Sequence, residues 1–401
     1  MHAQQRHNER MKNSIAIAGG GIGGLAAALL CAEAGADVRL FERAPAFTEV
    51  GAGIQIGPNV TRILQAWGLD SALQAVAAFP EQLQVRHAVS GDVTGQLRWG
   101  AHAVAQYGAP YATIHRADLH QMLLDALHAQ GRVSLNLNQG IAGYTPQTEG
   151  VQVHLDDGST LNAQALVGAD GLWSRVRAQL LGDAPARFSG HLAYRAMLVQ
   201  AELPAALRTH NVTVWMGPHL HVVQYPVRRG ELLNVVAIVH GQAPEDVSSW
   251  DHSANAADLK RALGPVAPDL QALIDAVPAW RLWPLCDRPP MASAAEQAQG
   301  RVALLGDAAH PMRPYMAQGA GMAIEDADAL GRCLALPEGD LPAQLAQYAQ
   351  QRWQRNARVQ QRAIRNGQIF HARGLLRWGR DMSMRLLGES LLDVPWLYNG
   401  P

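Results

Sequence analysis

The chain has 401 residues, of which 48% are hydrophobic and 17% are charged. This length supplies core for about two to three domains, and the composition excludes a disordered, collagen-like or coiled-coil protein in favour of a folded α/β protein. The 33 basic and 34 acidic residues give a net charge of −1, so no overall field attracts nucleic acid or an acidic membrane surface.

The cysteines and the first residues suggest a cellular compartment. Cys31, Cys286 and Cys333 are widely spaced, so they form neither a zinc-binding pattern nor a disulfide framework, and we expect a cytoplasmic protein without a metal site. Residues 1–13 are polar and lack the apolar run of a secretory signal. Residues 15–32 carry no charge, but their central glycines favour a strand, a tight turn and a helix over a membrane span.

The first elements along the chain form a βαβ unit. The pattern predicts short buried strands at residues 14–18 and 37–41, and a helix rich in alanine and leucine at residues 25–35. Two strands joined by a helix within so short a stretch lie parallel in one sheet. We therefore expect a Rossmann-like domain with a parallel sheet.

The later elements suggest a second, different region. The pattern predicts a helix at 59–67, an irregular stretch up to 110, a helix at 115–130, a hairpin at 151–161 and a strand at 165–169. Strand-like runs at 212–216, 221–227 and 232–239 are joined by turns, which indicates a separate, mostly antiparallel α+β region. A strand at 301–305, a helix at 319–336 and largely helical structure at 344–392 complete the predicted α/β fold.

The helical stretch near the C-terminus is rich in arginine between residues 351 and 385. A solvated or subunit-facing helix explains such a run of one charge. Contact with a phosphate-bearing cofactor is the alternative.

A glycine-rich loop follows the first predicted strand. Gly19, Gly21 and Gly24 form the pattern Gly-x-Gly-x-x-Gly, and Glu42 ends the next strand. The glycines allow a tight turn, a close approach of backbone N–H groups to a pyrophosphate, and close packing of helix on strand, while the acid can hold ribose hydroxyls. The combination predicts a dinucleotide site, and an unrelated glycine turn with a surface glutamate is the alternative.

Two later motifs place an aspartate at the end of a predicted buried strand. Asp170 lies in the first motif, at residues 168–171, and Asp307 lies in the second, at residues 306–311. A carboxylate in that position needs a polar partner, and a hydroxyl-bearing ligand supplies one. Gly319 and Gly321 then open a helix whose N-terminus can stabilise negative charge on a ring or carbonyl.

With these motifs the chain resembles the FAD-dependent aromatic hydroxylases of the p-hydroxybenzoate hydroxylase type, and most closely the salicylate, 3-hydroxybenzoate and 6-hydroxynicotinate monooxygenases. The resemblance runs from residue 15 to residue 398, and its motifs lie at 19–24 with 42–43, at 51–59, at 115–119, at 168–171, and at 306–311 with 316–325. It implies FAD-binding segments at 12–75, 111–187 and 284–343, a substrate domain at 76–110 and 188–283, and C-terminal helices at 344–401.

The resemblance also implies cofactor contacts. Glu42 would hold the adenosine ribose with Arg43 on the adenine side, and Arg116 would contact the phosphate and ribityl region of FAD. Asp307 would bind a ribityl hydroxyl or, through the following backbone, the pyrophosphate. The further cofactor-binding residues of this prediction are Gly19, Gly21, Gly24, Asp170, Gly171, Ala317, Gln318, Gly319 and Ala320. There is no second loop of the Gly-x-Gly-x-x-Gly type, which fits transient binding of NADH or NADPH.

The implied reaction is hydroxylation of an aromatic ring. Such enzymes reduce FAD with NADH or NADPH, add O₂, and pass a hydroxyl from the flavin C4a-hydroperoxide to a small phenolic or N-heteroaromatic acid. The protein positions the substrate, helps to deprotonate it and excludes water. The implied partners are therefore small molecules, without nucleic acid or membrane, and the implied assembly is a monomer or a homodimer.

His221 and Tyr225 are the candidate catalytic residues. They lie four residues apart on a predicted strand, hence on one face. If that face covers the flavin ring, His221 can accept or relay the phenolic proton and Tyr225 can bind a substrate oxygen. The alternative is a pair of satisfied polar residues on a sheet face.

The other candidate substrate-binding residues lie on three segments. Gln55 precedes Pro58 in the chain, at a position where relatives carry His, which weakens the hydroxynicotinate assignment in particular. Arg195 could meet a carboxylate or the flavin. Met312, Pro314 and Tyr315 follow the Asp307 motif and either line the pocket or pack in an ordinary core.

Four other functions compete with aromatic hydroxylation as explanations of these features. A flavin halogenase or a lipid-ring hydroxylase is disfavoured, because the sequence has no Trp-x-Trp-x-Ile-Pro motif and no membrane-docking helix. An FAD-binding, redox-responsive protein with weak or no turnover and a plain NAD dehydrogenase stay as alternatives. The dehydrogenase would purify colourless, whereas a flavoprotein would be yellow.

Overall fold

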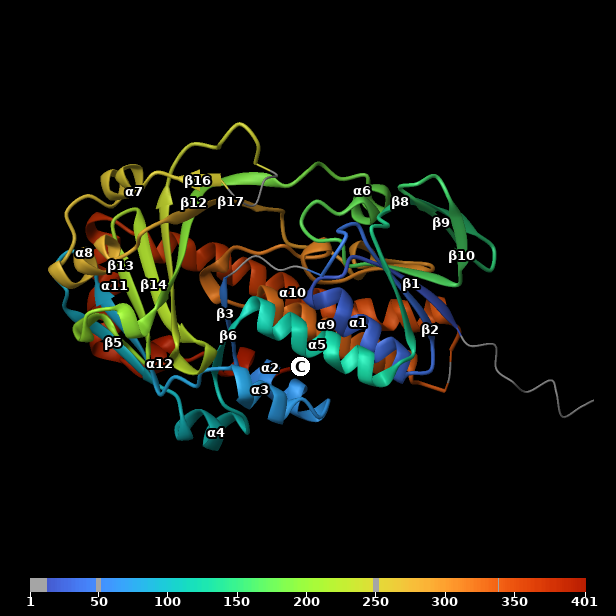
Figure 1. The fold of residues 1–401 in the computed structure, drawn as a ribbon, viewed down its shortest axis with the longest axis horizontal. Coiled ribbons are helices and arrows are strands. Elements are labelled where there is room, and N and C mark those ends of the chain that lie inside the picture. The colour runs from blue at the N-terminus through green and yellow to red at the C-terminus, as the bar shows by residue number, and fades with distance from the viewer. Residues whose placement is uncertain (1–12, 48–51, 248–251, 338) are drawn as a thin grey trace, which may run out of the picture.

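The computed structural model describes residues 13–47, 52–247, 252–337 and 339–401. Residues 1–12 of the polar N-terminal segment and Gly51 of the 51–59 motif lie outside this part of the chain. Two large sheets stand at opposite ends of the molecule, and long helices fill the space between them (Figure 1).

The first sheet has six strands in the order β18-β19-β11-β1-β2-β7. The bounds are β1 (Ser14–Ala18), β2 (Asp37–Glu42), β7 (Val133–Leu137), β11 (Ala165–Gly168), β18 (Ala298–Gln299) and β19 (Val302–Leu304). All neighbours pair in parallel except β18, which runs antiparallel to β19 at one edge. The predicted parallel sheet is confirmed, and its strands are short apolar runs because both of its faces are covered.

Helices α1 (Ile22–Glu33), α5 (Arg116–Gln130), α9 (Gly319–Leu334) and α10 (Leu341–Phe370) form the central layer. Helix α1 packs between α5 and α9, and Gly331 allows the close approach of α9, since a Cβ there would lie 2.7 Å from Leu30. This burial explains the uncharged run of residues 15–32. Among the helices of the described ranges, none combines the length and apolar character needed to cross a bilayer.

The second sheet has eight strands in the order β16-β17-β12-β15-β14-β13-β4-β5 and is antiparallel except between β13 and β4. The bounds are β4 (Gln82–His87), β5 (Val93–Arg98), β12 (Arg187–Val199), β13 (Val212–Gly217), β14 (Leu220–Val227), β15 (Leu232–His240), β16 (His252–Ala254) and β17 (Trp280–Asp287). The mostly antiparallel region is thus confirmed. One face of this sheet packs against helices α7 (Ala256–Leu263) and α8 (Pro268–Asp275).

The prediction of irregular structure up to residue 110 was wrong, since this stretch contains β4 and β5. Their alternation is hidden from the sequence because polar residues such as Gln82, Gln84 and Arg86 occupy half of the positions on β4. Two short helices, α3 (Asp70–Val76) and α4 (Ala101–Tyr107), flank the two strands.

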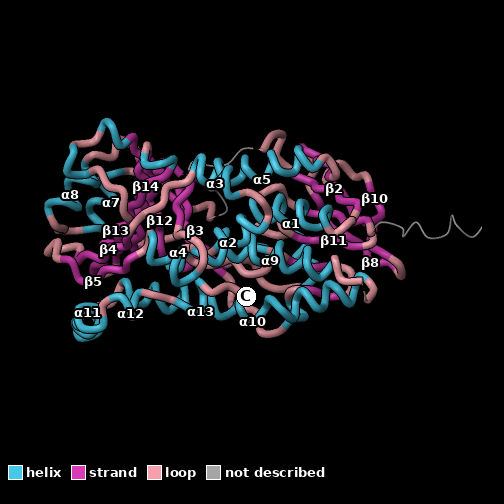
Figure 2. The backbone as a smooth tube through the Cα atoms, turned by 90° about the horizontal axis from the view of Figure 1, so that it is seen from below, coloured by secondary structure: helices cyan, strands magenta, loops and turns pink. Residues whose placement is uncertain are grey.

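The smaller elements lie between and around the two large sheets (Figure 2). They are the two-stranded sheet β3 (Gly53–Ile56) and β6 (Ala112–His115), the three-stranded sheet β8 (Ile141–Gln147), β9 (Gly150–Leu155) and β10 (Thr160–Ala163), and helices α2 (Pro58–Ala66), α6 (Arg175–Leu181), α11 (Gly374–Leu387), α12 (Glu389–Leu392) and α13 (Pro395–Tyr398). Gly53 lets β3 approach the second sheet, because a Cβ there would lie 2.7 Å from Tyr225.

Candidate active site

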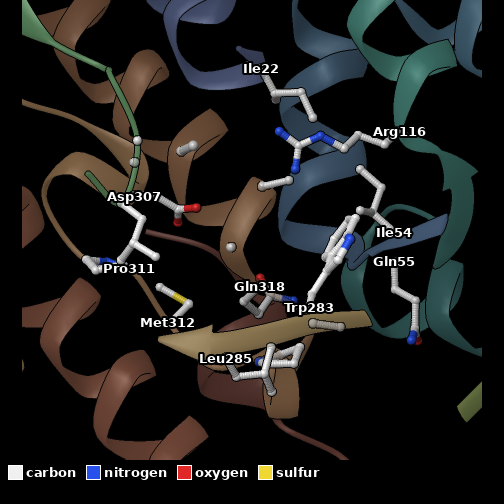
Figure 3. A pocket seen from close by; sticks show the side chains of 18 of the residues that line it. Ile22, Ile54, Gln55, Arg116, Trp283, Leu285, Asp307, Pro311, Met312 and Gln318 are labelled. Atoms are coloured by element: carbon white, nitrogen blue, oxygen red, sulfur yellow. The ribbon is translucent and has the colours of Figure 1, made fainter. Parts of the chain in front are cut away.

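A cavity of about 310 Å³ lies where the loops after three parallel strands meet one face of the second sheet. Gly21 follows β1, Gly171 follows β11 and Asp307 follows β19, and all three line the cavity. Figure 3 shows Asp307 among the side chains around it. Ligands bind outside the carboxyl ends of parallel strands in folds of this type. The opposite wall is the face of β14, β15 and β17 that α7 and α8 leave free.

The glycine loop has the tight geometry that its pattern predicts. Gly19 adopts a left-handed φ of 100°, and a Cβ there would lie 2.5 Å from the carbonyl oxygen of Ala169. A Cβ on Gly24 would lie 1.9 Å from the carbonyl oxygen of Gly19, so helix α1 starts directly on the loop. Gly21 caps α1 without a side-chain hydrogen bond, which leaves the first N–H groups of the helix for an anionic ligand at the cavity.

Glu42 lies beside this loop at the end of β2. Its Oε2 accepts a hydrogen bond from Gly20 N at 2.7 Å, and its Oε1 accepts one from Ala44 N at 2.8 Å. Each carboxylate oxygen keeps a further lone pair, so the carboxylate can still accept from a hydroxyl. Glu42 and the exposed Arg43 lie outside the cavity lining.

The predicted cofactor residues of the later motifs converge on the cavity. Arg116 opens α5, Asp307 follows β19, and Ala317, Gln318, Gly319 and Ala320 surround the start of α9; all six line the cavity. Ala317 has a left-handed φ of 51°, a costly conformation for a residue with a Cβ, which turns the chain into α9. Burial raises the pKa of Asp307 against the effect of nearby cations including Arg116.

Asp170 has another set of contacts. Its carboxylate accepts hydrogen bonds from Ser174 Oγ at 2.5 Å and from the backbone N–H groups of Arg175 and Val176 at 2.8 and 3.3 Å. It therefore caps the N-terminus of α6. Asp170 itself lies outside the cavity lining, whereas its neighbour Gly171 is part of the lining. The motif shapes the loop, and it reaches the cavity through Ala169 and Gly171.

The predicted face of β14 forms one wall. His221, Val223 and Tyr225 all line the cavity, as residues two apart on a strand do. Val236 and Ile238 of β15 and Trp283 and Leu285 of β17 extend the same face. Sequence reasoning missed these apolar residues, because only the pairing of β17 with β12 brings Trp283 to this face.

His221 is buried and bound to another histidine. Its Nδ1 lies 2.8 Å from Nε2 of His371, the residue that follows α10. Burial lowers the pKa of His221 to about 3, so the ring is neutral at pH 7 in the absence of an anionic ligand. The nitrogen that His371 does not contact, Nε2, is the one left for the cavity.

Tyr225 and Gln55 form a second polar group in the lining. Burial, opposed by Arg195 and a hydrogen bond to Gln55, raises the pKa of Tyr225 well above its usual range, so the phenol stays protonated. Tyr111 donates a hydrogen bond to Gln55 Oε1 at 2.8 Å. Gln55 is therefore held from two sides.

Arg195 is a half-buried cation at the cavity. Its guanidinium lies 3.7 Å from the centre of the Trp283 ring, and its Nε is buried without a hydrogen-bond partner in the described part of the chain. Burial lowers the pKa of Arg195 to about 10, which leaves it charged at pH 7. Its electrostatic neighbours are Tyr225 and Arg116, and no carboxylate of the described residues is among them.

The predicted wall after the Asp307 motif divides into two parts. Met312 and Pro314 line the cavity, and Met312 points toward it in Figure 3. Tyr315 does not line it, and its hydroxyl lies 2.6 Å from Nδ1 of His191 instead. The structure therefore brings two of these three side chains to the cavity.

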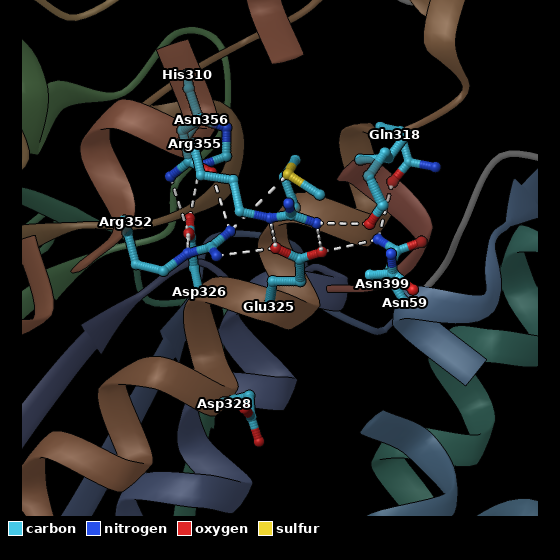
Figure 4. A network of polar contacts seen from close by, with 12 residues as sticks. Asn59, His310, Gln318, Glu325, Asp326, Asp328, Arg352, Arg355, Asn356 and Asn399 are labelled. Carbon is cyan, nitrogen blue, oxygen red and sulfur yellow. Dashed lines mark hydrogen bonds and ion pairs between the residues drawn. The ribbon is translucent and has the colours of Figure 1, made fainter. Parts of the chain in front are cut away.

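A buried ionic network supports the loops at the cavity (Figure 4). Asp326 on α9 accepts hydrogen bonds from Arg352 Nε at 2.8 Å and from Gly306 N at 3.2 Å, and its Oδ2 lies 2.5 Å from His310 Nε2. Burial alone would raise the pKa of Asp326, but His310 and Arg352 outweigh it and hold the pKa well below the usual range. The carboxylate thus fixes both ends of the segment that carries Asp307.

The same network explains part of the arginine-rich stretch. Arg352 and Arg355 of α10 both pair with Glu325, at 2.8 and 2.7 Å, and Arg352 is fully buried. Glu325 also accepts a hydrogen bond from Asn59 at 2.7 Å. For these two arginines the predicted solvated or subunit-facing helix was wrong, and so was the cofactor-phosphate alternative, because their partners are acids of α9 that local sequence patterns cannot identify.

Comparisons with known proteins agree with this geometry. The family model of the FAD binding domain matches residues 12–363. The 3-hydroxybenzoate 6-hydroxylase of Polaromonas naphthalenivorans (strain CJ2) is 38% identical over 387 residues, covering 96% of this chain and 95% of that protein. The 6-hydroxynicotinate 3-monooxygenase of Pseudomonas fluorescens is 35% identical over 390 residues, covering 95% and 96%.

A solved structure supports the same assignment. A salicylate hydroxylase in complex with its substrate superimposes with a TM-score of 0.81 at 28% identity, covering 97% of this chain and 95% of that chain. Similarity along nearly the whole length includes both sheets and the cavity between them. The chain therefore belongs to the FAD binding domain family, within its FAD-dependent aromatic hydroxylases.

Proposed function

We propose that the protein uses NADH or NADPH and O₂ to hydroxylate a small phenolic or N-heteroaromatic acid in the 310 Å³ cavity. The observation that carries this proposal is Arg195, a half-buried cation in the lining whose Nε has no hydrogen-bond partner, and which has no carboxylate among its electrostatic neighbours, in the described part of the chain. A buried charge requires a partner. The carboxylate of an aromatic acid supplies that partner.

The residues around the cavity fit FAD. The loop at Gly19 and Gly24 has no room for a Cβ, and the uncapped start of α1 suits a pyrophosphate. Glu42 would hold the adenosine ribose, Arg116 the phosphate region and Asp307 a ribityl hydroxyl. Backbone N–H groups at the start of α9 would face the pyrimidine edge of the ring. When bound and reduced, FAD supplies the activation of O₂ that converts an aromatic C–H bond to C–OH.

His221 and Tyr225 then act on the substrate itself. The neutral imidazole of His221 can accept the proton of a ring hydroxyl at Nε2, while its Nδ1 is held by His371. An anionic substrate beside Arg195 also favours the charged form of His221, which burial disfavours in the empty pocket. Tyr225 stays protonated and can donate a hydrogen bond to a substrate oxygen.

The rest of the lining excludes water. Val223, Val236, Ile238, Leu285 and Met312 present apolar side chains to the cavity. A dry site protects a reactive oxygen species from water and strengthens the contacts of Arg195. Gln55 lies at the rim, held by Tyr111, and is proposed to contact the substrate ring or its substituent.

A screen of aromatic acids tests this function. The FAD-loaded protein is mixed with NADH or NADPH and with 3-hydroxybenzoate, salicylate or 6-hydroxynicotinate, and nicotinamide oxidation and product mass are followed. We expect one acid to accelerate oxidation and to gain one oxygen atom. Oxidation that no acid accelerates would favour the FAD-binding, redox-responsive protein, and a neutral ring hydroxylated in preference to its acid would refute the role of Arg195.

We also propose that the protein acts in the cytoplasm on these small molecules alone, as a monomer or a homodimer. The near-neutral balance of charge supports this, because it provides no field for nucleic acid. Sedimentation of the FAD-loaded protein distinguishes the two assemblies.

A further inference from the structure

Three histidines gather beside His221 on the same face of the second sheet, outside the cavity lining. His191 comes from β12, His240 ends β15 and His371 follows α10. The register places His191 opposite His240 on neighbouring antiparallel strands, so both side chains share one face. One ring nitrogen from each of the three lies within 4.8 Å of the other two. These residues are called the three-histidine cluster below.

We infer that the three-histidine cluster binds a divalent transition-metal ion of the zinc type. Imidazole nitrogens are ligands that Zn²⁺, Ni²⁺ and Cu²⁺ prefer. Tetrahedral Zn²⁺ with Zn–N bonds of about 2.0–2.1 Å requires ligand nitrogens about 3.4 Å apart. His240 Nε2 and His371 Nδ1 are 2.9 Å apart, and small ring rotations bring the cluster to that spacing with a fourth position left for water.

The second ring nitrogens of the two buried ligands are already held. The Tyr315 hydroxyl lies 2.6 Å from His191 Nδ1, which leaves Nε2 as the ligand atom. His221 Nδ1 lies 2.8 Å from His371 Nε2, which leaves Nδ1 as the ligand atom. Such outer partners orient imidazoles in metal sites and fix their tautomers. Tyr315, which lies outside the cavity lining, would therefore act as the outer partner that orients His191.

The charges around the cluster permit a cation. Burial, together with neighbouring histidines and arginines, lowers the pKa of all three rings, that of His191 to about 4, so they are neutral at pH 7. Arg313 is neutralised by Asp287 at 2.5 Å, and Arg373 is exposed, so water and salt screen its charge. His240 is exposed too and gives an ion a path from solvent.

Metal binding would reach the cavity through one hydrogen bond. When His371 Nδ1 binds a cation, Nε2 must carry the proton and donate it to Nδ1 of His221. Neutral His221 then carries its own proton on Nε2. In the proposed function, Nε2 of His221 accepts the substrate proton. The metal-bound form has lost that acceptor, so this consequence rests on the proposed function. The cluster is therefore an inhibitory metal site.

Calorimetric titration tests the site. The FAD-loaded protein is stripped with a chelator, dialysed and titrated with Zn²⁺, and Co²⁺ absorption reports the coordination geometry. We expect one ion per chain and tetrahedral Co²⁺ bands. Affinity should be at least about 10- to 100-fold weaker in His240→Ala, because the loss of a ligand costs no less than the loss of an outer partner of a ligand. His240 is at the surface, so its loss spares the core, and His128→Ala, an exposed histidine on α5, is the matched control. Equal Zn²⁺ affinity in wild type and His240→Ala would overturn the site.

Turnover tests the link to His221. Zn²⁺ should slow acid-stimulated NADH oxidation in wild type and in His128→Ala but not in His240→Ala, and chelator should restore the rate. Zn²⁺ binding without inhibition would overturn the link and leave the site. An absence of acid-stimulated oxidation in the metal-free protein would instead overturn the proposed function, while the Zn²⁺ titration would still decide whether the site exists.

Discussion

Arg195 is the residue whose surroundings depend most on a ligand. Its guanidinium lies over the Trp283 ring without a carboxylate partner among the described residues. Arg195→Met should raise KM for an aromatic acid about 10- to 100-fold, since a hydrogen bond to a charged group contributes about 1.5–3 kcal/mol. Steady-state kinetics with the acid and with its neutral amide as control measure this. An equal loss for acid and amide would mean that Arg195 acts on the fold or on FAD.

A substitution at His221 should affect hydroxylation without affecting FAD binding. Its ring lines the cavity, but it belongs to the second sheet, away from the loops that the FAD prediction uses. His221→Ala should slow hydroxylation about 10²- to 10⁴-fold, the range for a lost proton acceptor, and leave the flavin content unchanged. Product formation and the ratio of flavin to protein absorbance report the two effects. A parallel loss of flavin would remove His221 from the catalytic residues.

A substitution at Asp307 should instead abolish FAD binding without unfolding the protein. It is half-buried at the end of β19, among the loops of the first sheet. Asp307→Ala removes the carboxylate predicted to hold a ribityl hydroxyl, so the protein should purify without flavin yet remain folded. Absorbance and circular dichroism measure both properties, with Asp157→Ala in an exposed hairpin turn as control. A normal flavin content would refute the assigned role.

Helices α9 and α10 carry the ionic network that fixes the Asp307 loop, and its strength depends on pH. The pKa of Asp326 is lowered in the folded state, so its contribution to stability is present above the ordinary value of 3.8 and is lost as the pH falls through the lowered folded value. Asp326→Asn should cost about 3–5 kcal/mol at pH 7, as breaking a buried pair does.

Thermal unfolding of wild type and Asp326→Asn at pH 7 and below pH 4 checks this dependence. The difference between the two should be constant near neutral pH and should shrink in acid. Asp258→Asn, which removes an exposed pair with Arg261, should cost less than about 1 kcal/mol. A difference that does not change with pH would contradict an ionic contribution of Asp326.

How much the sequence predicts depends on whether the signal is local. The glycine loop, the strand ends and the shared face of His221 and Tyr225 follow from spacing within one element, and the structure places them as expected, with Asp170 as an exception because its carboxylate caps α6. Arg352 and its acid lie 26 residues apart on different helices, and His371 meets His221 across 150 residues. No periodicity marks such pairs, which is why both the ionic network and the three-histidine cluster were absent from the prediction.

The whole molecule folds around a cavity that neither sheet completes alone. Residues of β14, β15 and β17 face loops of the parallel sheet across it. FAD should therefore stabilise both sheets together, by about 2.7 kcal/mol when free FAD is at 100 times its Kd. Tryptophan and flavin fluorescence during heating should report one common midpoint that rises with FAD concentration, and Asp307→Ala should show no rise. Two separate midpoints would indicate that the sheets unfold independently.

The wall of the cavity is assembled from residues as far apart as Gly21 and Ala323. A ribosome synthesises the glycine loop early, but the start of α9 leaves the exit tunnel only when most of the chain has been made. Coenzyme insertion must then be a late event in biogenesis, so a cell short of riboflavin would accumulate full-length, colourless polypeptide, and stalled nascent chains would carry none of the yellow pigment.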